Sequence, residues 1–202
     1  MQDRQDRRVL RSRAALMAAA VRLVSERGTT ALPITDLADA ADVSRQLVYL
    51  QFGDRDALLV AAAADLVERE LMPEVGDGGA SRRARTLAMA RHFARHRSFY
   101  RAMLTGSCAF LMTRALNRLF GSLITMAGVR ELFGDLDDAT VRDFATLITG
   151  GTGAIVNDWL IDADDPLDPE ELADRLLRLS TVFSGAHPTL APAEPGTRPS
   201  LP

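Results

Sequence analysis

Residues 34–52 read ITDLADAADVSRQLVYLQF. Apolar residues recur at helical spacing on both sides of a central turn, which predicts two short helices, about 34–41 and 45–51. Ala38 is small where two helices must approach closely, and the Ser44 hydroxyl group can cap the second helix. This is the pattern of a helix-turn-helix, whose second helix enters the major groove of DNA and meets base edges near its N-terminus.

Helical spacing continues outward from this pair, and no run shows the two-residue alternation of a half-buried strand, so we expect an all-α protein. The other predicted helices cover roughly 8–27, ending at Gly28; Asp54 to about Leu71; Ser81 to about His96; about 98–104; about 107–127; Asp137 or Asp138 to Ile161; and 168–184. The turn-rich stretch 73–80 is expected to separate an N-terminal unit, residues 8–71, from a larger C-terminal unit, residues 81–185. The proline-rich tail, residues 186–202, is predicted to be disordered.

Several short motifs around the helix pair follow one another in a fixed order. They are Gly28, Leu37-Ala38, Ala41-Asp42-Val43-Ser44, Val48-Tyr49, Gln51-Phe52, and Arg55-Asp56 with Leu58. In this order and spacing they resemble the TetR family of bacterial transcriptional regulators over the first seventy residues. Asp42 stands where the family has a turn glycine and where positive φ is expected, which Asp tolerates better than most residues. Pro33 stands where the family frequently has a Thr or Ser that caps the first helix of the pair.

The resemblance implies an N-terminal helix-turn-helix DNA-binding domain, a C-terminal helical bundle for ligand binding and dimerisation, and a double-stranded DNA operator as partner. A symmetric dimer would place two recognition helices about 34 Å apart and read a palindrome. The implied function is a repressor that a small molecule releases from DNA. An activator or a ligand-independent DNA-binding protein is the alternative. The residues implied to face DNA are Thr35, Ser44, Arg45, Gln46, Tyr49 and Arg55.

Residues 149–155 read TGGTGAI and look like a dinucleotide-binding turn. Such a turn needs a preceding strand, whereas the residues before it keep helical spacing. Glycine costs about 1 kcal/mol inside a helix, so we expect a partner helix to approach closely there. The resemblance implies a dimer interface on the last two helices. The expected interface residues are Gly150, Gly151, Gly153, Ile155, Trp159, Leu172, Leu176 and Leu179.

The central helices carry apolar residues that are candidates to line a ligand cavity, although a plain core shows the same spacing. The effector itself is not identified by the sequence. Residues 82–130 contain arginine and no acidic residue, which also suits an anionic ligand such as an acyl-coenzyme A. The candidate ligand-binding residues are Met89, His92, Phe93, Tyr100, Met103 and Phe110.

Composition excludes several other functions. All 24 basic residues are arginine, which excludes phosphate loops and Schiff-base chemistry that need lysine. His92 and His96 stand one helical turn apart without a recognisable third ligand, so we expect neither a metal site nor a cofactor, and a helical enzyme is disfavoured.

The charged N-terminus shows no signal peptide or membrane span, which predicts a cytoplasmic protein. An acid-rich block, residues 131–174, is expected to fold back on the arginine block and neutralise it.

Overall fold

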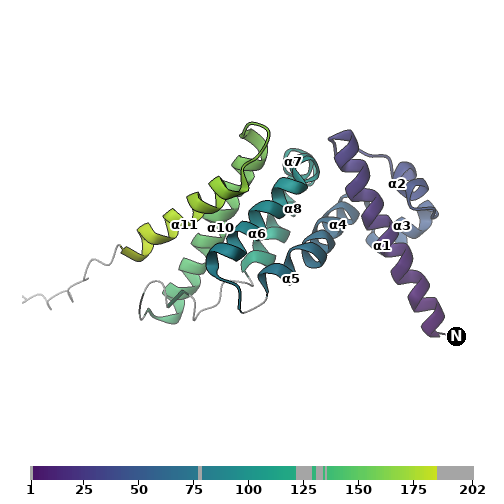
Figure 1. The fold of residues 1–202 in the computed structure, drawn as a ribbon. Helices are drawn as coiled ribbons and strands as arrows, with labels where there is room; N and C mark the ends of the chain where they lie inside the picture. The colour runs from purple at the N-terminus through teal and green to yellow at the C-terminus, as the bar shows by residue number, and fades with distance from the viewer. Residues whose placement is uncertain (1, 77–78, 122–128, 131–133, 135, 186–202) are drawn as a thin grey trace, which may run out of the picture.

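The computed structural model describes residues 2–76, 79–121, 129–130, 134 and 136–185, and every regular element among them is an α-helix. The predicted all-α fold is therefore confirmed. Figure 1 shows an elongated molecule with α1–α3 at one end and α10 and α11 at the other. The helices are α1 (Gln2–Arg27), α2 (Ile34–Ala40), α3 (Arg45–Phe52), α4 (Arg55–Glu70), α5 (Met72–Val75), α6 (Arg82–Arg95), α7 (Arg97–Thr105), α8 (Ala109–Gly121), α10 (Asp138–Asp162) and α11 (Pro169–Gly185).

Short polar side chains cap the helices at the predicted starts. Each accepts a hydrogen bond from a backbone N–H in the first turn, a group that has no partner inside the helix, and such a cap stabilises a helix by about 0.5–2 kcal/mol. Asp42 in the turn between α2 and α3 has a φ of 53°, the left-handed conformation expected there. The capping residues are Ser44, Asp54, Ser81, Asp137 and Asp168.

Two features differ from the predicted ones, and a third prediction is only partly covered by the described residues. Helix α1 begins at Gln2, six residues before the predicted start, because a fully polar helix end has no apolar face for periodicity to reveal. Helix α5 lies within the stretch predicted as a turn-rich joint. Helix α8 is described to Gly121, and the rest of the range predicted for it lies outside the described residues, as does the tail 186–202.

A single cluster of buried apolar side chains runs from α1 through α4 and α7 to α10 and α11. Helix α4 packs on α1 and α3 and also on α5 and α8, so it joins the two ends of the molecule. No helix in the described residues is long and apolar enough to cross a membrane.

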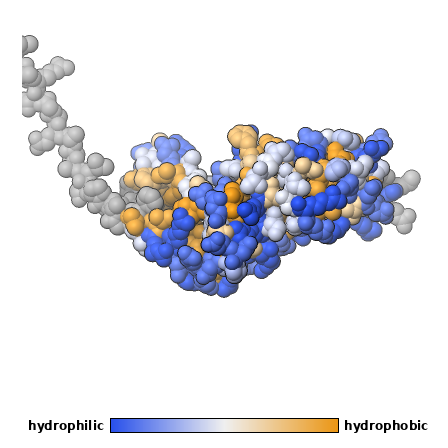
Figure 2. Space-filling model, turned by 90° about the horizontal axis from the view of Figure 1, so that it is seen from above, coloured by the Kyte–Doolittle hydropathy of each residue, from blue (hydrophilic) through white to orange (hydrophobic). Residues whose placement is uncertain are grey.

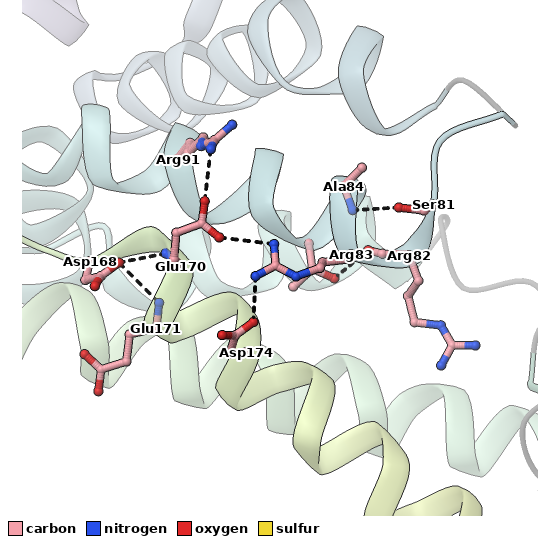
Figure 3. A network of polar contacts seen from close by, with 10 residues as sticks. Ser81, Arg82, Arg83, Ala84, Arg91, Asp168, Glu170, Glu171 and Asp174 are labelled. Atoms are coloured by element: carbon pink, nitrogen blue, oxygen red, sulfur yellow. Dashed lines mark hydrogen bonds and ion pairs between the residues drawn. The ribbon is translucent and has the colours of Figure 1, made fainter.

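The arginine and acidic blocks meet as expected. Arg83 of α6 bonds Glu170 at 3.1 Å and Asp174 at 2.9 Å, and Arg91 bonds Glu170 at 3.1 Å (Figure 3). Arg97 pairs with Asp165 in the same way. The pairs between α6 and α11 are about half-exposed, so each contributes little to the free energy of folding, but together they fix the register of α6 against α11. Arg97 lies in α7, and its side chain is only 11% exposed.

Candidate DNA-binding surface and ligand cavity

Helix α3 is anchored to the rest of the molecule through its inner face and its C-terminal end. Val48 is fully buried in the core. Arg13 of α1 donates a hydrogen bond from Nη1 to the Gln51 carbonyl at 3.1 Å, and its guanidinium carbon lies 4.3 Å from the centre of the Phe52 ring. The hydrogen bond and the cation–π contact together fix the end of α3 against α1.

The outer face of α3 is open to solvent. Arg45, Gln46 and Tyr49 are exposed, and Tyr49 retains 54% of its accessible surface. Leu50 is 80% exposed, which is unusual for a leucine in a short helix, and it lines a shallow hollow with Gln46 and Tyr49. An exposed helix face that combines an arginine, an amide, a phenol and an apolar side chain suits the edges of bases in a major groove.

Two further residues expected to face DNA, Thr35 and Ser44, are also exposed. The Ser44 hydroxyl accepts a hydrogen bond from the Leu47 backbone N–H at 3.3 Å as the cap of α3. Thr35 Oγ1 donates to Asp36 Oδ1 at 3.4 Å in α2. The structure therefore places five of the six predicted residues on the exposed surface of the helix pair.

Arg55, the sixth residue, is partly exposed, and its guanidinium group is hydrogen-bonded to two side chains of the same chain. Its Nε donates to Asp56 Oδ1 at 2.9 Å, and its Nη2 donates to Ser107 Oγ at 3.3 Å. Ser107 lies in the turn between α7 and α8, so this side chain links the start of α4 to that turn. Sequence spacing cannot reveal such a partner because the two residues are 52 positions apart.

The turn between α7 and α8, residues 106–108, forms a joint with the N-terminal helices. Gly106 lies so close to Thr30 that an added methyl group would overlap the Thr30 side chain, which is itself only 3% exposed. Cys108 is fully buried beside it, and burial, together with the negative charge of Asp56, raises the pKa of its thiol to about 11. We call these contacts the joint.

A cavity of about 450 Å³ lies between α6, α8 and α10 and is also bordered by α5. This volume falls within the usual range for small-molecule sites. Of the predicted ligand-binding residues, Met89 and Phe93 line it. The other apolar wall residues are Val75, Leu116, Phe120 and Val156, and the polar ones are Arg82, Arg85, Thr86, Thr113, Asn117, Thr149, Thr152 and Asn157.

Four predicted ligand-binding residues lie elsewhere. Tyr100 and Met103 are fully buried in the core, and Phe110 is 71% exposed. His92 is buried, and its Nε2 lies 2.8 Å from the Tyr100 hydroxyl group. Burial lowers the pKa of His92 to about 4 and raises that of Tyr100, so both are neutral at neutral pH. Apolar periodicity locates the inward faces of helices but does not distinguish a filled core from a cavity.

The wall residues absent from the prediction include Thr149, Thr152 and Gly153 of α10. The glycine-rich stretch thus lies inside a helix, and a Cβ on Gly153 would meet Asn117 Oδ1 of α8 at 3.0 Å. Gly153 therefore allows a close approach between helices of one chain. The small residues of this stretch leave space beside the helix, so they were the feature of the sequence that could have indicated a cavity wall.

The other residues predicted at a dimer interface divide into two groups. Trp159 and Leu172 are buried in the core of this chain, while Ile155 and Leu176 pack partly against that core. The second group is open: a Cβ on Gly150 or Gly151 would meet nothing within 4 Å, and Leu179 is 38% exposed. Two exposed residues absent from the prediction are Leu147 and Val182, at 58% and 65% exposure.

Comparison with known proteins finds similar sequences and similar folds. The sequence profile of the bacterial regulatory proteins of the tetR family matches residues 16–62, which span α2, α3 and parts of α1 and α4. The HTH-type transcriptional regulator AlkX of Mycobacterium tuberculosis is 29% identical over 170 residues, covering 82% of this chain and 71% of that protein.

Solved structures of the same kind share the fold. FadR of Thermus thermophilus, a TetR-family repressor in complex with lauroyl-CoA, superposes with a TM-score of 0.61 at 21% identity, covering 91% of this chain and 100% of that one. The TetR-family repressor AlkX of a Dietzia strain, implicated in biodegradation of n-alkanes, has a TM-score of 0.52 at 22% identity, covering 86% of this chain and 93% of that one.

Proposed function

The chain belongs to the TetR family of DNA-binding transcriptional regulators and is not an enzyme, and on that premise we propose that it is a cytoplasmic repressor that binds a palindromic operator as a dimer. The observation that carries this proposal is the exposed face of α3. Arg45, Gln46 and Tyr49 are held outward by a helix whose inner side is packed and whose end is bonded to α1. Base-reading side chains need such a rigid support.

A dimer supplies the second recognition helix. Exposed apolar residues on α10 and α11 (Leu147, Leu179 and Val182) and the open surface at Gly150 and Gly151 support an interface there. Figure 2 shows hydrophobic residues gathered at the end of the molecule that carries the C-terminal helices. We assign the free surface of these two helices to the interface, and Trp159 and Leu172 to the core beneath it.

The cavity between α6, α8 and α10 supports an amphipathic effector with an apolar chain and an anionic end. Its apolar wall suits an acyl chain, and Arg82 and Arg85 stand at its polar side. Within the described part of the chain, no carboxylate pairs with Arg82 or Arg85. Arg83, which lies between them, forms ion pairs with Glu170 and Asp174 of α11, and Figure 3 shows the Arg82 side chain turned away from these ion pairs. The lauroyl-CoA bound by the FadR relative has this chemistry, and we propose a long-chain acyl-CoA or fatty acid here.

The joint connects the cavity to the DNA-binding helices. Leu116 and Asn117 of α8 line the cavity, and α8 begins directly after the turn that contacts Thr30 and Arg55. A ligand that moves α8 would therefore move the start of α4, which packs against α3. A change in the angle between the two recognition helices of a dimer would release the palindrome.

The test is a mobility-shift assay with the purified protein and the DNA that flanks its own gene, at two salt concentrations. We expect a specific complex that weakens as salt rises, because phosphate contacts release counterions. Arg45→Ala and Tyr49→Ala should abolish the specific complex, and Arg142→Ala, which removes an exposed arginine from α10, should retain it. Loss of binding in all three variants, or in none, would contradict the assignment of α3.

The effector is tested on the same complex. Lauroyl-CoA should dissociate it at micromolar concentration, whereas free coenzyme A, which lacks the acyl chain, should not. Retention of the complex with lauroyl-CoA and with free fatty acids of several lengths would reject the acyl ligand and leave the DNA-binding assignment intact.

A further inference from the structure

A second cluster of polar side chains lies outside the ligand cavity, where α4 and α6 end. Glu70 is the last residue of α4, His92 lies in the last turn of α6, and His96 is the C-cap residue of α6. Glu70 Oε2 lies 2.7 Å from His96 Nε2 and 3.9 Å from His92 Nδ1, and one ligand atom from each residue lies within 4.8 Å of the others. The fold thus supplies the third ligand that the His92–His96 pair lacks in the sequence.

The orientation of His92 is the strongest indication of a missing ligand. Its ring is 3% exposed, and its Nε2 is engaged with the Tyr100 hydroxyl group at 2.8 Å. The other ring nitrogen, Nδ1, is buried without a hydrogen-bond partner on the side of Glu70. Buried polar atoms are nearly always satisfied, so a partner for this nitrogen is expected. In a metal-bound histidine, one ring nitrogen usually binds the metal while the other makes a hydrogen bond that fixes the ring orientation.

The surroundings favour a cation. The C-terminal ends of α4 and α6 meet here, and helix C-termini carry partial negative charge. Burial opposes ionisation of Glu70, but the hydrogen bond from His96 and the neighbouring positive charges outweigh it and lower the pKa of the carboxyl group. Arg95 Nη1 lies 3.8 Å from Glu70 Oε2 and competes for the carboxylate, but its side chain is 60% exposed and free to turn into solvent.

We propose that Glu70, His92 and His96 bind one divalent transition-metal ion of the zinc class, with water in the remaining position. Zinc bonds of about 2.0–2.1 Å in a tetrahedral site put neighbouring ligand atoms about 3.3 Å apart. The two observed spacings to Glu70 Oε2, 2.7 and 3.9 Å, lie on either side of that value. The ion would replace the proton shared by Glu70 and His96 and would give Nδ1 of His92 its partner. It would also tie α4, which leads to the DNA-binding helices, to α6, which lines the ligand cavity.

The experiment uses the full chain without an affinity tag, stripped with a chelator, and measures Zn²⁺ by isothermal titration calorimetry and Co²⁺ by visible absorption. We expect one equivalent bound at micromolar or lower Kd and a Co²⁺ spectrum of a four- or five-coordinate nitrogen–oxygen site. His96→Gln and Glu70→Gln, both at partly exposed positions, should weaken binding about 100-fold or more. His187→Gln, which removes the only other histidine, should leave it unchanged.

Tyr100→Phe provides an independent test because it removes the group that orients His92 without removing a ligand. It should weaken Zn²⁺ binding by about 10- to 100-fold. Absence of stoichiometric binding in the wild-type chain would overturn the site. Equal affinity of wild type, His96→Gln and Glu70→Gln would likewise overturn it, because the ion would then bind elsewhere. The wild-type Co²⁺ spectrum gives an answer even where a variant fails to fold.

Discussion

Gly106, in the turn between α7 and α8, lies directly against Thr30, in the loop between α1 and α2, with no space for a side chain between them. The backbone of Gly106 has a φ of −97°, which any residue can adopt, so glycine is required here by the contact and not by conformation. The contact is the tightest point of the joint between the DNA-binding helices and the helices that line the cavity.

Gly106→Ala should therefore destabilise the protein by about 1–3 kcal/mol, the usual cost of overpacking. The added methyl group would also approach the Ala102 carbonyl oxygen to 2.8 Å. Thr30→Ala in the same chain should restore part of the loss, and urea denaturation of the single and double variants measures this coupling. Additive effects of the two substitutions would show that the residues are not in contact.

Arg13→Ala should lower the free energy of unfolding by about 1–2 kcal/mol, because it removes a charge-assisted hydrogen bond to the Gln51 carbonyl and a cation–π contact with Phe52. We also expect weaker operator binding, because α3 loses its anchor to α1. Arg11→Ala, at an exposed neighbouring position, is the matched control. Thermal unfolding and mobility shift measure both effects, and equal behaviour of the two variants would refute the anchoring role.

Gly151→Leu should convert dimers to monomers. Among the described residues, no atom lies within 4 Å of a Cβ placed at Gly151, and leucine is a better helix former than glycine by about 1 kcal/mol, so the monomer should fold normally. Sedimentation equilibrium measures the assembly state, and circular dichroism checks the fold. Gly79→Leu, in the loop before α6, is a control for which no change is expected. A dimer that tolerates Gly151→Leu would place the interface elsewhere.

Replacing Arg82 and Arg85 together with glutamine should weaken lauroyl-CoA binding by about 10- to 100-fold, the range expected for loss of charge-assisted hydrogen bonds to an anionic group. Arg83→Gln is the control, because that arginine pairs with Glu170 and Asp174 of α11 and not with the cavity. Tryptophan fluorescence or calorimetry with the acyl-CoA measures the affinities. The same loss in the Arg83 variant would indicate a general charge effect and not a site.

Cys108 should react slowly with a thiol reagent in the native protein. Burial raises the pKa of its thiol to about 11, so at pH 8 only about one molecule in a thousand carries the reactive thiolate. We expect a rate at least about 100-fold below that of a free cysteine, rising to the free value in urea. The reaction thus reports opening of the joint. A native rate equal to the denatured one would mean that the turn beside Thr30 is not closed.

Local signals predicted most of the helices, but neither the first residues of α1 nor helix α5. Apolar spacing and capping residues such as Ser44, Asp54 and Asp137 predicted where they begin, because caps and periodicity act over one or two turns. The same local pattern predicted the outward-facing positions of α3, which are exposed, while their contact with DNA stays a prediction. Assignment of the central apolar residues was less complete, since Met103 belongs to the core while Val156 and Thr152 line the cavity. Periodicity tells which way a side chain points but not whether the space beyond it is filled.

The sequence by itself determined an all-helical fold and a helix-turn-helix pair, because those features depend on neighbours within a few residues. The regulator function was implied by the resemblance to the TetR family. The tertiary structure decided which distant residues meet: Arg55 with Ser107, Thr30 with Gly106, and Glu70 with His92 and His96. These partners lie on different helices or on the turns that join them, and their meeting depends on how the helices pack against one another. Packing of this kind is a property of the whole core, so no local pattern in the sequence records it.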